Sequence, residues 1–154
     1  DVPQSRERLI FIGVRKDLNK EPKYPIPSKK IITVKQAIKH LEELYIEDLI
    51  EYKDLKPGEK VYNYGTSEKR VYSNKPLSTL CKSGGTKGGN RDIHYSKNRR
   101  LSIDELKILC SFPEDWKMSG NDREKVDRLG NTVMPKFMQA IAETIKKEIL
   151  NGQA

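Results

Sequence analysis

Three polar side chains stand at two-residue spacing near the start of the chain, directly before a short apolar run. They are Gln4, Arg6 and Arg8, and the apolar run that follows is Leu-Ile-Phe-Ile at 9–12. In an extended chain, residues at this spacing project from one face, and a short continuous apolar run is typical of a buried strand. The pattern predicts three donors at the mouth of a buried strand, where they could hold an anionic or base-like ligand. The alternative is an edge strand with a solvated polar face.

Two further blocks lie downstream. The first runs from Arg100-Leu-Ser-Ile-Asp-Glu-Leu to Ser-Phe-Pro-Glu-Asp-Trp at 111–116, and the second is Gly-Asn-Thr-Val at 130–133. The opening Gln-x-Arg-x-Arg resembles the eighth block of the DNA (cytosine-5) methyltransferases, and the two later blocks are similar to the ninth and tenth. Their order and separation also fit this family, which has a target-recognition region between the eighth and ninth blocks.

The resemblance implies a mechanism. In this family a cytosine is flipped out of the duplex, a thiolate attacks its C6, and C5 accepts a methyl group from S-adenosyl-L-methionine. Arg8 is then expected to face O2 of the flipped cytosine, where a cation stabilises charge that builds on the ring. Arg6 and Gln4 are expected to position that site and the adjacent backbone.

The last block is expected to contribute to the cofactor site. Asn131 suits an N-cap, which would place Gly130-Asn-Thr at a helix N-terminus, where free amides attract anions. The resemblance places Asn131 and Thr132 beside the methionyl group of S-adenosyl-L-methionine. The family has a glutamine just upstream where this chain has Arg128.

Motifs that the family needs for chemistry do not occur in this sequence. They are the Gly-rich cofactor turn, the Pro-Cys nucleophile loop and the Glu-Asn-Val acid motif. Cys81 and Cys110 both follow leucine, and Cys110 falls in the apolar pattern of a helix, so we expect it to be buried. We therefore expect the C-terminal part of an enzyme, inactive alone, whose nucleophile comes from an N-terminal part or a partner subunit. The chain could be an expressed fragment, a truncated product or a subunit of a split enzyme.

Double-stranded DNA is the expected partner. The chain carries 30 Lys and Arg against 22 Asp and Glu, a net charge of +8, which suits binding to phosphate. Residues 82–91 hold four glycines and three cations; glycine lets backbone amides approach a ligand closely, and cations contact phosphates. The alternative is a solvated surface loop. The expected DNA-binding residues are Arg70, Thr79, Lys82, Gly84, Gly85, Lys87 and Arg91.

The fold class expected is α+β, in three parts. Residues 1–18 would end the catalytic domain, 19–116 would form a target-recognition domain of short strands and helices, and 117–154 would return to the catalytic domain. The strand in the first part and the C-terminal helix in the last would complete a Rossmann-like α/β methyltransferase domain.

Local patterns predict the individual elements. Thr33-x-x-Gln36 and Ser102-x-x-Glu105 are capping-box signatures. His94 is expected to be a hydrogen-bonded structural residue. The elements expected are a helix beginning at Thr33, a turn at 56–59, strands at 60–64 and 69–73, a helix at 102–111 and a last helix at about 132–150.

Composition also indicates which kinds of site and which cellular compartment to expect. The two cysteines have no paired spacing, so no disulfide framework and no metal site are expected, and they fit a reducing cytoplasm of the bacterial or phage type. No apolar run approaches the ~18 residues that a membrane helix needs, and no signal peptide is seen.

A non-catalytic DNA-binding or regulatory remnant stays open as an alternative function. The tRNA-methylating branch of the family is marked by Cys-Phe-Thr, which is absent.

Overall fold

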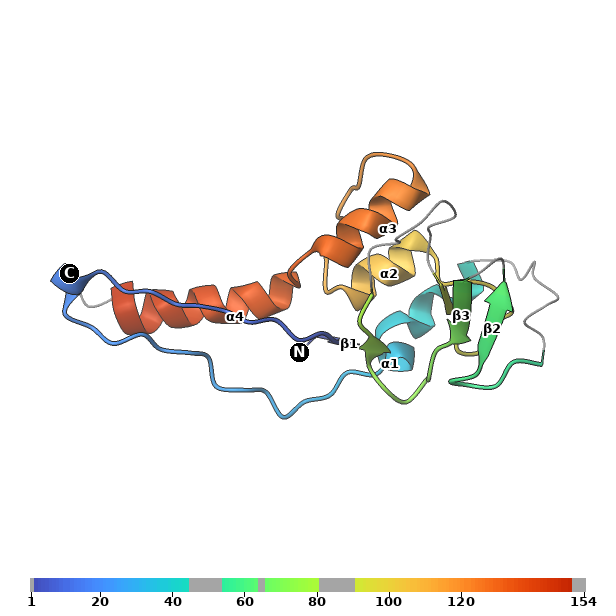
Figure 1. Cartoon of the computed structure of the whole chain (residues 1–154), viewed down its shortest axis with the longest axis horizontal. Helices are drawn as coiled ribbons and strands as arrows, with labels where there is room; N and C mark the ends of the chain where they lie inside the picture. Colours follow the sequence, from blue (N-terminus) through green and yellow to red (C-terminus); the bar gives the residue numbers. More distant parts are fainter. Residues whose placement is uncertain (1, 45–53, 64–65, 81–90, 151–154) are drawn as a thin grey trace.

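Helices and short strands form one lobe, from which a helix and an extended segment project (Figure 1). The computed structural model describes residues 2–44, 54–63, 66–80 and 91–150. The elements in chain order are β1 Gln4–Ser5, the 3-10 helix η1 Lys16–Leu18, α1 Val34–Ile38, the 3-10 helix η2 Lys39–Leu44, β2 Lys60–Asn63, β3 Thr66–Arg70, β4 Leu77–Ser78, β5 Asp92–Ile93, α2 Ile103–Leu109, α3 Asp122–Asn131, α4 Pro135–Ile145 and the π-helical turn η4 Lys146–Leu150. Helices and strands mix, as an α+β class requires.

Two small sheets occur in the described part of the chain. In the first, β1 pairs in parallel with β4, so that Gln4 lies opposite Leu77 and Ser5 opposite Ser78. In the second, β3 lies between β2, which is antiparallel to it, and β5, which is parallel. The first sheet joins the start of the chain to residues more than 70 positions downstream.

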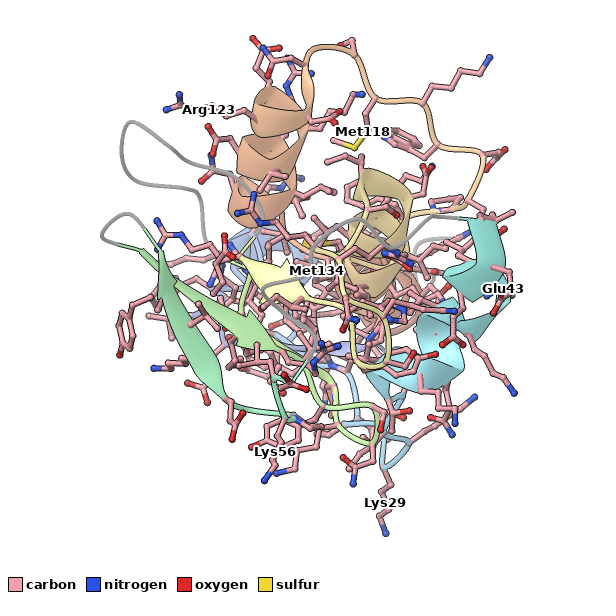
Figure 2. The ribbon with its side chains drawn as sticks, turned by 90° about the vertical axis from the view of Figure 1, so that its right-hand side faces the viewer. Lys29, Glu43, Lys56, Met118, Arg123 and Met134 are labelled. Carbon is pink, nitrogen blue, oxygen red and sulfur yellow. The ribbon has the colours of Figure 1, made fainter. Side chains whose placement is uncertain are left out.

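The core is built around α2, which contacts both α1 and α3. Val34 and Ile38 of α1 belong to the same buried cluster as the apolar side chains of α2 and α3. Figure 2 shows Met134 inside the lobe and Arg123 of α3 pointing away from it. The fully buried side chains include Val34, Ile38, Leu77, Ile93, Leu106, Leu109, Cys110 and Leu129.

Both predicted capping boxes are confirmed. The Thr33 hydroxyl accepts from the Gln36 amide, and the Gln36 side chain accepts from the Thr33 amide. Ser102 and Glu105 make the same reciprocal pair at the start of α2. The predicted turn at 56–59 is also present, with the Glu59 amide donating to the Lys56 carbonyl.

The C-terminal helix differs from the prediction. The helix expected from about 132 begins three residues later, as α4 at Pro135, and another helix, α3, ends just before it at Asn131. The Asn121–Glu124 capping box, which the sequence analysis missed, starts α3 upstream. Proline lacks an amide hydrogen and favours the first position of a helix, so α4 begins there.

The apolar run at 9–12 is not a buried strand, which corrects the prediction. Leu9 is 81% exposed and Phe11 is 84% exposed. Within the described residues the run pairs with no strand, and Figure 1 shows it leaving the lobe beside α4. An apolar run becomes a buried strand only if a sheet edge is available to it. The second predicted strand also shifts, from 69–73 to β3 at 66–70.

A buried ionic network holds the segment 94–100 to α2. Arg99 donates to both carboxylate oxygens of Glu105 at 2.8 Å, and the Glu105 side chain is fully buried. Nε2 of His94 lies 3.5 Å from the same carboxylate, and backbone amides donate to Nδ1. Burial lowers the pKa of His94 to about 4, so the ring is neutral near pH 7. His94 is therefore structural, as expected.

We predict that Glu105→Gln destabilises the chain by about 3–5 kcal/mol, because Arg99 would keep a buried charge without its counter-ion. Urea denaturation followed by circular dichroism measures the free energy of unfolding. Glu114→Gln, on an exposed carboxylate that lies 2.9 Å from Nε2 of His40, is the matched control and should change stability by less than about 0.5 kcal/mol. Equal effects of the two substitutions would contradict the structural role of the network.

Candidate functional site

The side chains of Gln4, Arg6 and Arg8 line one cavity. Its volume is about 270 Å³, and its opposite side is formed by Val133, Met134 and Phe137. These last residues belong to the Gly-Asn-Thr-Val block and to the start of α4. The structure thus brings the opening motif and the last block together across more than 120 positions of sequence.

The three motif side chains differ in their partners. Gln4 is buried, and its Nε2 donates to Sγ of Cys110 at 3.6 Å. Arg6 is half-buried and donates to two backbone carbonyls, that of Leu80 at 2.7 Å and that of Gly130 at 2.6 Å. These contacts make Gln4 and Arg6 part of the scaffold.

Arg8 is the exposed member of the motif. Within the described part of the chain its guanidinium donates only to the carbonyl of the neighbouring Glu7, at 2.8 Å. A guanidinium has five N–H donors, so most of those of Arg8 have no protein partner among the described residues. Arg8 is therefore the motif residue that can meet an incoming ligand.

Arg6 also stabilises the end of α3. The carbonyl of Gly130 is one of the last in this helix, where backbone carbonyls lack helical partners and the dipole is negative. A guanidinium there satisfies a carbonyl and opposes the partial charge. The same side chain reaches Leu80, which directly precedes the Gly-rich segment, so it links the motif, the expected recognition loop and the last block.

The position of Asn131 and Thr132 corrects an expectation. Asn131 is the last residue of α3 and Thr132 is its C-cap, with its amide donating to the Leu129 carbonyl at 3.3 Å. The block therefore lies at a helix C-terminus, not at an N-terminus with free amides. Both residues remain near the cavity, because the next residue, Val133, lines it.

Three of the expected DNA-binding residues, Arg70, Thr79 and Arg91, lie in the described part of the chain. Arg70 is only 4% exposed and donates to the carbonyls of His94 and Lys97 and to Asn98, so its side chain holds the segment 94–98. Thr79 is exposed, and its hydroxyl donates to the Ser5 carbonyl at 2.8 Å. Arg91 is half-buried. The residues Lys82, Gly84, Gly85 and Lys87 lie outside the described residues.

Some site residues were missed by sequence reasoning. Ser28 and Lys30, from the proline-containing connector, also line the cavity. No local pattern marks them, because the chain brings them there only by leaving the lobe and returning (Figure 1).

Among the described residues no group of His, Cys, Asp and Glu could hold a metal ion. None of the helices in that part is long and apolar enough to cross a membrane.

Comparison with curated proteins gives relatives of one kind. The Type II methyltransferase M.NgoFVII of Neisseria gonorrhoeae is 28% identical, over 94% of this chain and 46% of its own length. The Type II methyltransferase M1.HphI of Haemophilus parahaemolyticus is 30% identical, over 95% of this chain and 45% of its own. The chain thus spans just under half the length of these relatives.

A shorter relative is matched over most of its own length. The Type II methyltransferase M.AquIB of Picosynechococcus is 30% identical over 108 residues, which are 62% of this chain and 74% of that protein. The family model for C-5 cytosine-specific DNA methylase matches residues 1–147. This chain therefore belongs to the C-5 cytosine-specific DNA methylase family.

Proposed function

We propose that this chain is the C-terminal, DNA-recognition part of an enzyme that transfers a methyl group from S-adenosyl-L-methionine to C5 of a flipped cytosine. The observation that carries the proposal is the cavity shared by Gln4, Arg6 and Arg8 with the last block. In the proposed division, 1–18 and 117–154 complete a Rossmann-like catalytic domain and 19–116 recognise the target. DNA is the substrate class of the family.

Arg8 is the proposed catalytic residue of this chain. Attack on C6 of cytosine pushes negative charge onto the ring, including O2. A guanidinium held at O2 stabilises that charge more in the transition state than in the ground state. Arg6 and Gln4 would act as positioning residues, since both are already bonded to the scaffold. S-adenosyl-L-methionine would supply the methyl group, and Asn131 and Thr132 would lie near its methionyl end.

A companion part, which is either the N-terminal part of the same enzyme or a partner subunit, would supply the nucleophile, the acid and most of the cofactor site, because the given sequence holds no Pro-Cys or Glu-Asn-Val motif. The exposed apolar run at 9–12 is suited to such a companion. Leu9 and Phe11 together with Phe137 and Met138 leave apolar surface on this end of the molecule. A sheet edge of the companion would bury the run and pair its backbone.

We expect no methyl transfer from the purified chain alone, and restored transfer when a protein carrying the family's Gly-rich turn, Pro-Cys and Glu-Asn-Val motifs is added. Incorporation of labelled methyl groups into duplex DNA measures both. Activity of the chain alone would contradict the proposal. Lack of restoration by its cognate companion would favour the non-catalytic alternative, a DNA-binding or regulatory remnant.

In the reconstituted enzyme, Arg8→Ala should slow single-turnover methyl transfer by about 10²–10³-fold, roughly 2.7–4 kcal/mol, the scale for one preorganised donor. Duplex affinity should change little, since Arg8 is one of many cations. Arg15→Ala, an exposed arginine paired with Asp17, is the control and should keep the parent rate. An unchanged rate in Arg8→Ala would make this arginine dispensable for chemistry.

Lys82, Lys87 and Arg91 are proposed phosphate contacts of the recognition segment. Each phosphate contact adds about −0.9 to the slope of log K against log salt concentration, so replacing all three with alanine should flatten the slope by up to about 2.7. The control replaces Lys16, Lys20 and Lys23, which lie between β1 and α1, with alanine and should leave the slope unchanged. If the first triple variant keeps the parent slope, the Gly-rich segment does not contact phosphates.

A further inference from the structure

A groove beside the β1–β4 pair has no role in the site described above. Its volume is about 290 Å³, and its polar lining comes from Lys69 of β3, Lys75, and the paired residues Ser5 and Ser78. Ser5 lies between Gln4 and Arg6, and neighbouring residues of a strand project to opposite faces. The groove and the motif cavity therefore lie on opposite sides of β1.

The floor of the groove is apolar and its rim is cationic. Val71 and Leu77 are both buried and close the floor. Nζ of Lys69 donates to the Ser78 hydroxyl at 3.2 Å. Nζ of Lys75 lies 4.6 Å from the centre of the Tyr72 ring. None of the residues that line the groove in the described structure is acidic.

The backbone on which the two lysines are carried is fixed. The Lys69 amide donates to the Arg91 carbonyl at 3.0 Å, and the Lys75 carbonyl accepts from the Val34 amide of α1 at 2.9 Å. The Leu77 amide donates to Pro3 at 2.9 Å. The backbone positions from which the two lysine side chains reach the groove are thus fixed before any ligand arrives, which lowers the entropy cost of binding an anion.

We propose that this groove binds a sugar–phosphate unit of the duplex backbone that flanks the target base. The phosphate would lie between Lys69 and Lys75, and the deoxyribose would pack on the apolar floor. The Ser78 hydroxyl could donate to a phosphate oxygen. This proposal rests on the proposed function, because it takes DNA as the ligand.

The position of the groove favours DNA over other anions. Ser78 leads directly into Thr79 and Leu80, which are tied to the motif through Ser5 and Arg6. A backbone phosphate held there would align the duplex with the cavity on the other side of β1. Such a contact sets register without reading bases, so its contribution is independent of DNA sequence.

The test measures binding of the full chain to duplex DNA by fluorescence anisotropy. Salt is varied from about 50 to 200 mM, a range over which phosphate contacts make the affinity fall steeply. The double variant Lys69→Ala with Lys75→Ala should flatten the slope of log K against log salt by up to about 0.9, because the two lysines share one phosphate contact. Lys35→Ala with Lys39→Ala removes the same charge from exposed positions of the same lobe and should leave the slope unchanged.

Two further variants separate a binding effect from misfolding. Lys69→Arg with Lys75→Arg keeps both charges and should retain the parent slope. Ser78→Asp keeps both lysines but adds a carboxylate to the groove, and should weaken binding to any duplex. Circular dichroism checks that each variant folds.

The outcomes are distinct. If the parent chain binds no duplex even at the lowest salt concentration, the proposed DNA recognition fails, and the groove with it. If the parent binds with a steep slope but the groove variant matches its control in slope and affinity, only the groove proposal is overturned.

Discussion

The side chain of Arg6 is the contact on which the arrangement of the site depends. It donates to the carbonyls of Leu80 and Gly130, which lie 74 and 124 positions away in sequence. Charge-assisted hydrogen bonds of this kind are among the stronger polar contacts in proteins. Together with the β1–β4 pairing and the Thr79–Ser5 bond, they hold the motif, the start of the recognition segment and the last block in one place.

The arginines of the chain have different structural roles. Arg6, Arg70 and Arg99 all donate to backbone carbonyls or buried acceptors and hold segments of the fold. Arg8 is exposed and has only a local partner in the described structure. Residue type alone does not separate these roles, because each arginine carries the same charge. Burial and geometry separate them: of the two arginines in the opening motif, Arg6 is bonded to the scaffold and Arg8 is exposed.

The features that could be predicted from sequence are those that depend on a few consecutive residues. The boxes at Thr33 and Ser102 each need only a hydroxyl and a side chain three positions later, and both formed. The clustering of the motif residues followed from strand alternation. The family resemblance, read from three blocks in order, agrees with the match over 1–147.

The structure differs from the predictions where the outcome depends on residues that are far away in sequence. Arg70 was placed among the expected DNA-binding residues, and no local pattern predicts that its side chain is buried and donates to acceptors in the segment 94–98. The run at 9–12 was expected to be a buried strand, yet in the described structure it pairs with no strand and Leu9 and Phe11 are exposed. The boundary between α3 and α4 was missed because Asn131 by itself suits the N-cap of a following helix. In the structure Asn121 is the N-cap of α3, and Asn131 is the last residue of that helix.

The central claim is that Arg6 is built into the scaffold while Arg8 is left for the substrate. A crystal structure of the reconstituted enzyme on duplex DNA with a flipped target cytosine would test it most directly. We expect the Arg8 guanidinium within hydrogen-bond distance of O2 of that cytosine, and Arg6 still bonded to the carbonyls of Leu80 and Gly130. An Arg6 that has left those carbonyls to contact the base, or an Arg8 directed away from it, would contradict the claim.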